Sequence, residues 1–372
     1  MRIPLSAPEI TEQDIEAVTG VLRTSSLSMG PKVGEFERAI SDYVGASHAI
    51  AVNSGTSGLH LCIRALGISE GDEVLLPSFT FIAVANAVRY ERATPVFIDV
   101  DPQTLNLDPT LLERAITRRT RAIIVVHTFG CPGELADILQ IARRHGLFVV
   151  EDACEAIGAE YQGQKVGALG DVGVFAFYPN KQITTGEGGA VVTNNSEIAL
   201  QVRKLRNQGR DDSEQWFQHT QLGYNYRISD INCALGIEQL KRIDAILDRR
   251  ELIAREYSDA LGSVPELIIP AMLLPRRKIS WFVYVVRLSS RFDEAQRDWI
   301  VKEMKSRGIA LGRYFAPIHL QPIYQPSTSG KSALPVTEFQ ASRALALPFF
   351  NRIRAEEIKE VCQTLVELIR PG

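Results

Sequence analysis

The chain has 372 residues, of which 45% are hydrophobic and 23% are charged, and this composition is that of an ordinary globular protein with apolar material for one large or two medium domains. Its net charge of -3 excludes a global basic field that would attract nucleic acid or an anionic membrane, although a local cluster can still bind a small anion. The five scattered cysteines include no CxxC pair and indicate neither a disulfide framework nor a zinc cage.

The cellular location is predicted from two further features. The first eight residues, Met1 to Pro8, lack the long apolar core of a signal peptide. No stretch of the sequence approaches the roughly 20 apolar residues that span a bilayer. We therefore expect a cytoplasmic protein with reduced thiols, without a metal site and without nucleic-acid or membrane partners.

Seven short β-rich runs alternate with helical stretches between about residues 50 and 195. The runs cover residues 49–52, 73–76, 95–98, 122–126, 147–150, 172–178 and 190–193. This alternation predicts an α/β fold in which a mostly parallel sheet is covered by helices on both faces. Ligands of such sheets bind beyond the carboxyl ends of the strands, so polar residues that follow the runs are candidate site residues.

The last third of the chain is predicted to form a second domain. A long helix over Ser229 to Leu261 is followed by a Pro-rich break at residues 265–275. We predict a large domain over residues 1–250 and a smaller α+β domain over 251–372, on which the N-terminal segment can also pack. The smaller domain should contain a strand over 281–287 and helices over 293–307 and 355–369.

The segment Asn53 to Gly58 (NSGTSG) follows the first β-rich run and precedes a helix that is expected to begin near Leu59. Small hydroxyl residues at a helix N-terminus expose backbone N–H groups, and the helix dipole favours an anion there. The segment is therefore shaped for a phosphate. A plain strand–turn–helix connection capped by Ser or Thr explains it equally well.

Glu151 and Asp152 come directly after the run 147–150, which places Asp152 at the carboxyl end of a strand. A buried carboxylate needs a cationic partner, and a protonated pyridine nitrogen is such a partner. Holding that nitrogen protonated is what makes pyridoxal phosphate (PLP) an electron sink. The alternative is a helix N-cap Asp beside a solvated Glu.

Lys181 follows the run 172–178 and precedes the glycine-rich segment Thr184 to Gly189 (TTGEGG). Most lysines are solvated, but this one leaves the end of a predicted buried strand. A desolvated lysine releases its proton more readily, and the free amine can form a Schiff base with an aldehyde cofactor such as PLP. The glycines let the backbone approach a ligand, and Glu187 is either a ligand contact or a turn residue.

A fourth segment, Leu222 to Arg227 (LGYNYR), mixes aromatic residues with an amide and a guanidinium ahead of the long helix. Arg227 can bind a carboxylate or a phosphate through two parallel hydrogen bonds. The alternative is an aromatic-rich loop that packs on its own helix.

In combination and in order, these segments resemble the DegT/StrS family of PLP-dependent sugar aminotransferases, which have the fold type I architecture. The resemblance runs nearly from end to end and rests on five motifs, which are 3–8 (IPLSAP), 30–37 (GPKVGEFE), 151–153 (EDA), 185–189 (TGEGG) and 317–322 (PIHLQP). It implies a large domain with a mostly parallel seven-stranded sheet and a smaller α+β C-terminal domain. It also implies a homodimer with the active site at the subunit interface.

The resemblance assigns the chemistry to two residues. Lys181 is expected to form the internal aldimine with PLP and then to move the proton between the cofactor and the substrate carbon. Asp152 is expected to pair with the pyridine nitrogen, and Phe81 to stack on the ring.

Further cofactor contacts are implied in the same way. Gly55, Thr56 and Ser57 are expected to hold the phosphate, and Asn225 to reach the phosphate of the neighbouring subunit's cofactor. Glu155 is expected beside the phenolic oxygen, where the family often has glutamine. A carboxylate there repels a phenolate-like oxygen unless one of the two carries a proton.

The chain departs from the family pattern five residues before the lysine. Family members usually have a serine there that bonds the phosphate, whereas this chain has Ala176. One lost hydrogen bond corresponds to about 1 kcal/mol, so we expect somewhat weaker retention of the cofactor.

The implied reaction has two stages with ping-pong kinetics. L-glutamate converts PLP to pyridoxamine phosphate (PMP), and the amine then passes to a nucleotide-linked keto sugar. Family members with Gly-Glu-Gly-Gly after the lysine often aminate a 4-keto carbon, whereas many 3-keto enzymes carry Gly-Asp-Gly-Gly, so Glu187 favours a 4-keto-6-deoxy hexose. Tyr314 and His319 are candidates for the sugar pocket, and Arg227 and Arg313 for the diphosphate or the donor carboxylate.

Three alternatives stay open at this point. They are a 3-keto sugar aminotransferase, a sugar dehydratase of the same family, and a PLP-binding regulatory protein without turnover. Family relatives that dehydrate sugars carry histidine in place of the lysine, so Lys181 argues against dehydration.

Overall fold

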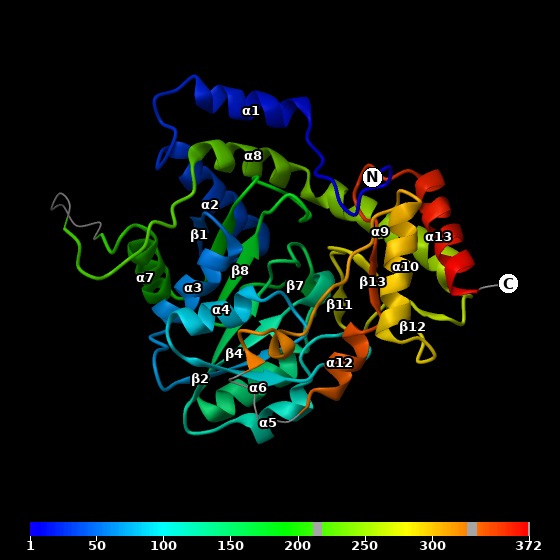
Figure 1. Ribbon diagram of the computed structural model, residues 1–372. Helices are drawn as coiled ribbons and strands as arrows, with labels where there is room; N and C mark the ends of the chain where they lie inside the picture. Colours follow the sequence, from blue (N-terminus) through cyan, green and yellow to red (C-terminus); the bar gives the residue numbers. More distant parts are fainter. Residues whose placement is uncertain (211–217, 326–332, 371–372) are drawn as a thin grey trace.

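The computed structural model describes residues 1–210, 218–325 and 333–370 (Figure 1). Its α-helices are α1 (Glu12–Leu22), α2 (Pro31–Val44), α3 (Gly55–Ala65), α4 (Ala83–Tyr90), α5 (Leu112–Ala115), α6 (Leu135–His145), α7 (Ser196–Arg206), α8 (Asp230–Lys241), α9 (Ile243–Leu261), α10 (Glu294–Ser306), α12 (Pro335–Ala341) and α13 (Ala355–Ile369). Short 3-10 helices are η1 (Pro109–Leu111), η2 (Thr128–Gly130) and η3 (Ile318–Leu320). Among these described residues, no helix combines the length and the apolar character needed to cross a membrane.

The strands form one large sheet and two small ones. They are β1 (His48–Val52), β2 (Glu73–Pro77), β3 (Thr94–Ile98), β4 (Thr120–Val126), β5 (Phe148–Asp152), β6 (Glu160–Tyr161), β7 (Gln164–Lys165), β8 (Val172–Ala176), β9 (Gly189–Thr193), β10 (Leu267–Ile268), β11 (Arg277–Lys278), β12 (Tyr284–Leu288) and β13 (Ala344–Leu347). The large sheet has seven strands in the order β1-β9-β8-β5-β4-β2-β3. β9 runs antiparallel to both of its neighbours and the other pairings are parallel, which confirms the predicted mostly parallel α/β sheet.

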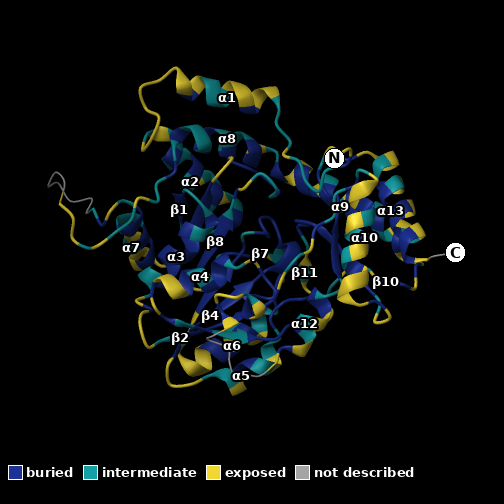
Figure 2. Ribbon diagram, viewed as in Figure 1, coloured by how far each residue is buried: buried dark blue, intermediate teal, exposed yellow. Residues whose placement is uncertain are grey.

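Successive residues of the central strands enter different cores, because side chains alternate between the two faces of a sheet. On β4, Ile123 and Val125 pack with α2 and α6, whereas Ile124 and Val126 pack with α3, α4 and α7. Both faces of the sheet are therefore buried, which is why the strands read as continuous apolar runs in the sequence (Figure 2).

The carboxyl ends of β1, β2, β4, β5 and β8 meet at one edge of the sheet, since these strands run in the same direction. At this edge each strand ends at, or is followed by, a polar or small residue. Ser54, Ser78, His127, Asp152 and Ala176 lie at or just after these ends. This edge is where the predicted site residues of the large sheet gather.

A second apolar core lies around the sheet β10-β12-β13 and helices α9, α10 and α13. Ile243 and Leu247 of α9 belong to the large core, whereas Ile253 and Leu261 belong to the second one. The core thus changes within α9, close to the predicted domain boundary at residue 250, which stays a prediction. Ile3 is fully buried in the second core and pairs with Ile309.

Two predicted elements of the last third of the chain are wrong in their bounds. The long helix over 229–261 is interrupted at Arg242, which has φ -116° and ψ 17°. Its guanidinium donates a hydrogen bond to the Glu9 carbonyl and forms an ion pair with Asp14. The strand predicted from Trp281 begins only at Tyr284, because Trp281 has a φ of +49°, outside the extended region.

The two helices predicted in the smaller domain are confirmed. α10 spans Glu294–Ser306, and Asp293 and Gln296 close a capping box at its start. α13 covers Ala355–Ile369, as predicted. Both helices pack an apolar stripe on the second core.

Candidate active site

A cavity of about 420 Å³ lies at the carboxyl edge of the large sheet. It is closed by the ends of β1, β4, β5 and β8 and by residues of the chain after α9. Its lining consists of Ser54, Gly55, Thr56, Leu59, Thr80, Phe81, Ala83, Val126, Asp152, Cys154, Glu155, Ala176, Tyr178, Asn180, Lys181, Glu187, Gly188, Phe282, Tyr314 and Phe315. Segments that are far apart in the sequence thus meet around one hollow.

Lys181 lies in the loop that follows β8, with its backbone N–H donated to the Tyr178 carbonyl at 2.9 Å. Its side chain is only 13% exposed. The Nζ atom is 3.5 Å from Oε1 of Glu155 and 4.1 Å from the ring centroid of Phe282. The ammonium is therefore held inside the cavity by a carboxylate and an aromatic face.

Glu155 is buried beside this lysine, just after β5. Its Oε2 accepts the backbone N–H of Phe129 at 3.0 Å, which leaves Oε1 directed at Lys181. Burial raises the pKa of Glu155 above its ordinary value, and the charge of Lys181 and the Phe129 amide offset this only in part. The side chain is therefore a carboxyl that takes up a proton more readily than a solvated one.

Asp152 is the last residue of β5, as predicted, and its carboxylate lines the cavity. Its Oδ1 accepts the backbone N–H of Cys154 at 3.1 Å. No helix begins at this position, and the neighbouring Glu151 is fully buried rather than solvated. The alternative of an N-cap Asp beside a solvated Glu is therefore wrong.

Glu151 points to the opposite face of β5 from Asp152 and accepts four N–H groups. They come from His127 at 3.0 Å and from the amides of Gly167, Leu169 and Gly170 at 2.8, 2.7 and 2.7 Å. His127 Nδ1 accepts the Gly133 N–H at 3.1 Å, so Nε2 carries the proton that is donated to Glu151. This buried pair fixes β4 to β5 beneath the cavity.

Burial alone raises the pKa of Glu151, but the hydrogen bonds from His127 and from the Gly170 and Gly167 amides outweigh it, so the pKa is lowered overall. His127 was missed in the sequence. It directly follows the β-rich run 122–126, so the rule that selected Asp152 would also have selected His127.

Helix α3 begins at Gly55, four residues earlier than predicted, so it starts within the candidate phosphate-binding segment 53–58. Ser54 is the N-cap, and its Oγ accepts the backbone N–H of Ser57 at 3.1 Å. Gly55 and Thr56 line the cavity at the end of the helix, where backbone N–H groups have no intrahelical partner. Ser57 instead points to Ser54, with 2.9 Å between the two Oγ atoms, and lies outside the lining.

Ala176 lies across the cavity floor from Gly55. A Cβ atom on Gly55 would come within 2.7 Å of the Ala176 Cβ and 3.0 Å of the Cys154 Sγ. Position 55 therefore has no room for a side chain, and only glycine allows the helix end to approach β5 and β8 this closely. Cys154, which was not predicted as a site residue, completes this floor, and burial raises the pKa of its thiol well above the ordinary value.

Aromatic side chains form the walls of the cavity. Phe81 is 60% exposed although it lines the cavity, so one face of its ring is open to a ligand. Tyr314 and Phe315 stack on each other and on Phe129, and Phe282 lies under Lys181. Phe282 and Phe315 were not predicted because neither lies at the end of a β-rich run or in one of the five motifs.

Two sugar-pocket candidates are placed differently. Tyr314 lines the cavity, and burial raises its pKa. His319 is buried outside the lining, where Nδ1 accepts from the Ser78 hydroxyl at 2.7 Å and Nε2 lies 3.2 Å from Glu338. Because Ser78 precedes Phe81 by three residues, His319 fixes the loop that carries this ring.

The remaining candidates lie at or beyond the cavity mouth. Glu187 lines the cavity with an exposed side chain, and its carboxylate has no hydrogen-bond or ion-pair partner within the described residues. Arg227 donates to the Asn207 side chain at 3.0 Å, and Arg313 pairs with Asp298 at 3.0 Å on the surface of the smaller domain. Neither arginine lines the cavity of the single chain.

Asn225 is exposed, in a loop that is anchored on α3 rather than on its own helix. The rings of Tyr224 and Tyr226 stack with centroids 5.0 Å apart, and both contact His60. The Tyr226 hydroxyl lies 3.0 Å from His60 Nδ1, and Tyr224 donates to Glu91 at 3.1 Å. The alternative in which this loop packs on the following helix is therefore wrong.

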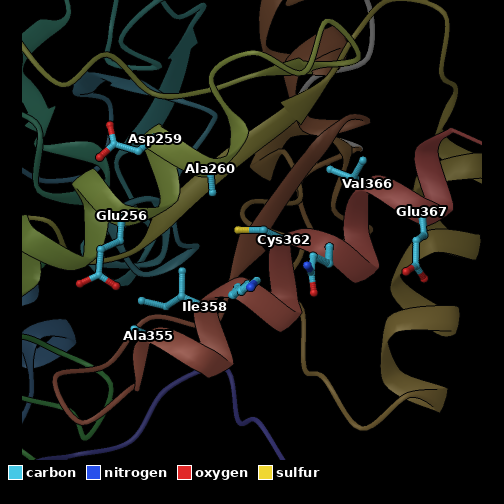
Figure 3. A pocket seen from close by; sticks show the side chains of 10 residues that line it. Glu256, Asp259, Ala260, Ala355, Ile358, Cys362, Val366 and Glu367 are labelled. Atoms are coloured by element: carbon cyan, nitrogen blue, oxygen red, sulfur yellow. The ribbon is translucent and has the colours of Figure 1, made fainter.

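A larger and more open hollow of about 850 Å³ lies between α9 and α13 (Figure 3). Acidic and aliphatic side chains dominate its walls, among them Glu256, Asp259, Ile358 and Glu367. None of the site residues predicted from the sequence lines it. The smaller cavity at the strand ends carries the lysine, the aspartate and the helix terminus, so we assign the chemistry there.

Comparison with known proteins agrees with this assignment. The model of the DegT/DnrJ/EryC1/StrS aminotransferase family matches residues 8–366. GDP-perosamine synthase of Caulobacter vibrioides is 40% identical over 371 residues, which cover 99% of this chain and 98% of that protein.

Solved structures match over the whole length. DesV of S. venezuelae, in complex with a ketimine intermediate, has a TM-score of 0.93 and 34% identity over 100% of this chain and 99% of its own. Spr1654 of Streptococcus pneumoniae, in its PLP form, has a TM-score of 0.95 and 27% identity over 99% of both chains. The same protein has been solved in a PMP form, in accord with the dependence of this family on PLP and PMP.

These matches confirm the resemblance that the sequence motifs indicated and the fold type I architecture. They cover both the large sheet and the smaller C-terminal core. The chain therefore belongs to the DegT/DnrJ/EryC1/StrS family and is an enzyme, a sugar aminotransferase.

Proposed function

We propose that this chain binds PLP through Lys181 and transfers the amino group of L-glutamate to a nucleotide-linked 4-keto-6-deoxy hexose. The observation that carries the proposal is the position of Lys181. Its Nζ lies inside the cavity at the carboxyl edge, 3.5 Å from Glu155, on a floor that also presents Asp152. Few lysines are held this way without a chemical role.

The lining fits a flat, phosphorylated, cationic ring. Gly55 and Thr56 present the N-terminus of α3 to an anion, and the open face of Phe81 suits an aromatic ring. Asn180 adds a buried side-chain oxygen that lines the cavity and has no hydrogen-bond partner within the described residues. An orphaned polar atom of this kind is explained by a bound group.

When bound, PLP supplies an aldehyde that condenses with amines and a ring that withdraws electrons from the substrate carbon. The protein residues do the rest. Lys181 holds the cofactor and carries protons at its Nζ, and Asp152 offers a carboxylate to a protonated ring nitrogen. Tyr314 and Phe315 exclude water from the inner wall.

The acceptor is proposed from two observations. The relative that is 40% identical is named GDP-perosamine synthase, which favours a GDP-linked sugar as the first acceptor to test. Glu187 stands at the cavity mouth with an exposed carboxylate, where it can accept hydrogen bonds from sugar hydroxyls. The diphosphate needs cations that the lining of the single chain does not supply beyond Lys181, in keeping with a site completed by a second copy in a homodimer.

The test uses purified protein reconstituted with PLP. Addition of L-glutamate should remove the absorption band of the lysine-bound cofactor, and a GDP-linked 4-keto-6-deoxy sugar should then restore it and appear as the amino sugar by mass spectrometry. The matched acceptors are the 3-keto isomer and the same sugar on uridine and thymidine diphosphate. A band that glutamate leaves unchanged would contradict turnover, and amination of the 3-keto isomer alone would contradict the proposed position.

A further inference from the structure

Glu155 and Lys181 form a largely buried ion pair on the cavity floor. The Lys181 side chain is 13% exposed and that of Glu155 is 9% exposed. Oε2 of Glu155 is anchored by the Phe129 amide at 3.0 Å, which directs Oε1 to the Lys181 Nζ at 3.5 Å. This geometry leaves one short path for a proton between the two side chains.

The other ionisable groups around Glu155 are poor partners for that proton. Burial raises the pKa of the Cys154 thiol well above its ordinary value and also raises the pKa of Tyr314, so both already hold their protons. Asp152 lies on the same floor and its negative charge further disfavours a charged Glu155. Lys181 is the cation of the described lining, and its ion pair is with Glu155.

We propose that Glu155 is the proton acceptor that frees the Lys181 amine for bond formation with the cofactor aldehyde. The inference rests on the proposed function, because it assumes that Lys181 binds the cofactor. One proton of the ammonium moves from Nζ to Oε1, and the Nζ lone pair attacks the aldehyde carbon. The two remaining protons leave with the aldehyde oxygen as water, a C=N bond replaces C=O, and Glu155 ends as a neutral carboxyl.

The position of Glu155 favours this transfer. Its burial makes the charged carboxylate less favourable than it would be in water, and transfer from Lys181 replaces two buried charges by two neutral groups. If the phenolic oxygen of the cofactor lies beside residue 155, as the family resemblance implies, a neutral carboxyl would donate a hydrogen bond there instead of repelling it. Glutamine at this position would keep the shape and the hydrogen bond but could not take a proton.

The experiment measures how fast the apoprotein captures PLP across a pH series, by stopped-flow absorbance of the C=N band. We expect Glu155→Gln to slow capture at neutral pH by about 10²-fold, the usual contribution of a general base, and to move the pH midpoint of the rate upward. Glu113→Gln is the matched control, because it removes one carboxylate charge from the surface, outside the cavity lining. It should keep the wild-type midpoint.

Two results would overturn the inference. The first is capture by Glu155→Gln at the wild-type rate and midpoint. The second is an equal shift in Glu155→Gln and Glu113→Gln, which would assign the effect to the net charge of the protein. Glu155→Asp, which keeps the carboxylate, guards against misfolding: its midpoint should follow the wild type, and a midpoint that follows Glu155→Gln counts against the inference.

Borohydride reduction of the wild type separates this inference from the proposed function. A PLP adduct mapped to Lys181 supports the cofactor linkage whatever the Glu155 variants do. Absence of an adduct on Lys181 defeats the proposed function itself. An adduct together with unchanged kinetics of Glu155→Gln defeats only the proton transfer.

Discussion

Glu151 and Glu155 lie four residues apart, and both are buried, yet their surroundings have opposite effects on the carboxyl. Glu151 accepts N–H groups from His127 and three amides, and its pKa is lowered. Glu155 accepts one amide and faces Lys181, and its pKa is raised. Burial alone therefore does not decide the charge of a carboxyl, since the number of fixed donors does.

The comparison also separates a structural site from a chemical one. The fully satisfied Glu151 ties two strands together on the side of β5 away from the cavity. The partly satisfied Glu155 lies in the cavity, where a ligand or a proton can complete its bonding. We therefore expect the surroundings of Glu151 and those of Glu155 to respond differently to substitution.

Replacement of Lys181 by Ala should produce the largest effect, because it removes the group that is proposed to bind the cofactor and to carry the proton. Turnover should fall by at least about 10⁴-fold, the range reported when a covalent catalytic group is removed. Steady-state kinetics with L-glutamate would measure the loss. Stability should change little. A variant that unfolds instead would show that Lys181 has a structural role, like that of Glu151.

Replacement of Glu151 by Gln should destabilise the fold by about 3–5 kcal/mol, because the amide group faces N–H donors that it cannot satisfy and leaves a fully buried network broken. Urea denaturation of the apoprotein would measure it. Glu113→Gln is the matched control, since Glu113 pairs with Arg144 on the surface at 2.9 Å and should contribute less than about 1 kcal/mol. An equal loss of unfolding free energy in both variants would show that the buried Glu151 network contributes no more than a surface ion pair.

The pH dependence of stability should have opposite signs at the two carboxyls. The contribution of Glu151, with its lowered pKa, is present above the ordinary carboxyl pKa of 4.5 and is lost as the pH falls through the folded value. The contribution of Glu155, with its raised pKa, is present below 4.5 and is lost as the pH rises through the folded value. Unfolding of the wild type and of each Gln variant from about pH 2 upward would resolve the two slopes, and slopes of the same sign would refute the comparison.

Replacement of Ala176 by Ser should have the smallest effect. The added hydroxyl lies near the α3 terminus and restores a hydrogen bond of about 1 kcal/mol to a phosphate there, which corresponds to about a fivefold tighter binding of PLP. Equilibrium dialysis would measure the affinity. Weaker binding would mean that the contact between positions 176 and 55 is too close for the extra oxygen.

The sequence predicted the positions of Asp152 and Lys181 because both stand at or just after the ends of β-rich runs. Asp152 ends β5, and Lys181 follows β8 by a short loop. Periodicity and turn residues are local signals, and local signals suffice when a parallel sheet gathers its strand ends at one edge. The same signals placed most strands to within two residues, and the largest errors were at the start of α3 and around Trp281.

The rest depended on contacts between segments that are remote in the sequence. Nothing near Glu151 indicates that it binds His127, because the pairing requires β4 and β5 to be neighbours. Phe282 and Phe315 reach the cavity only because the chain returns from the second core to the large sheet. The break at Arg242 has a tertiary cause too, since its guanidinium bonds the segment that precedes α1.

The burial of Ile3 within the second core has a consequence for the synthesis of the protein. This residue pairs with Ile309 and shares its core with Ile369, near the other end of the chain. A ribosome must therefore release nearly the whole polypeptide before the first few residues can reach their final position.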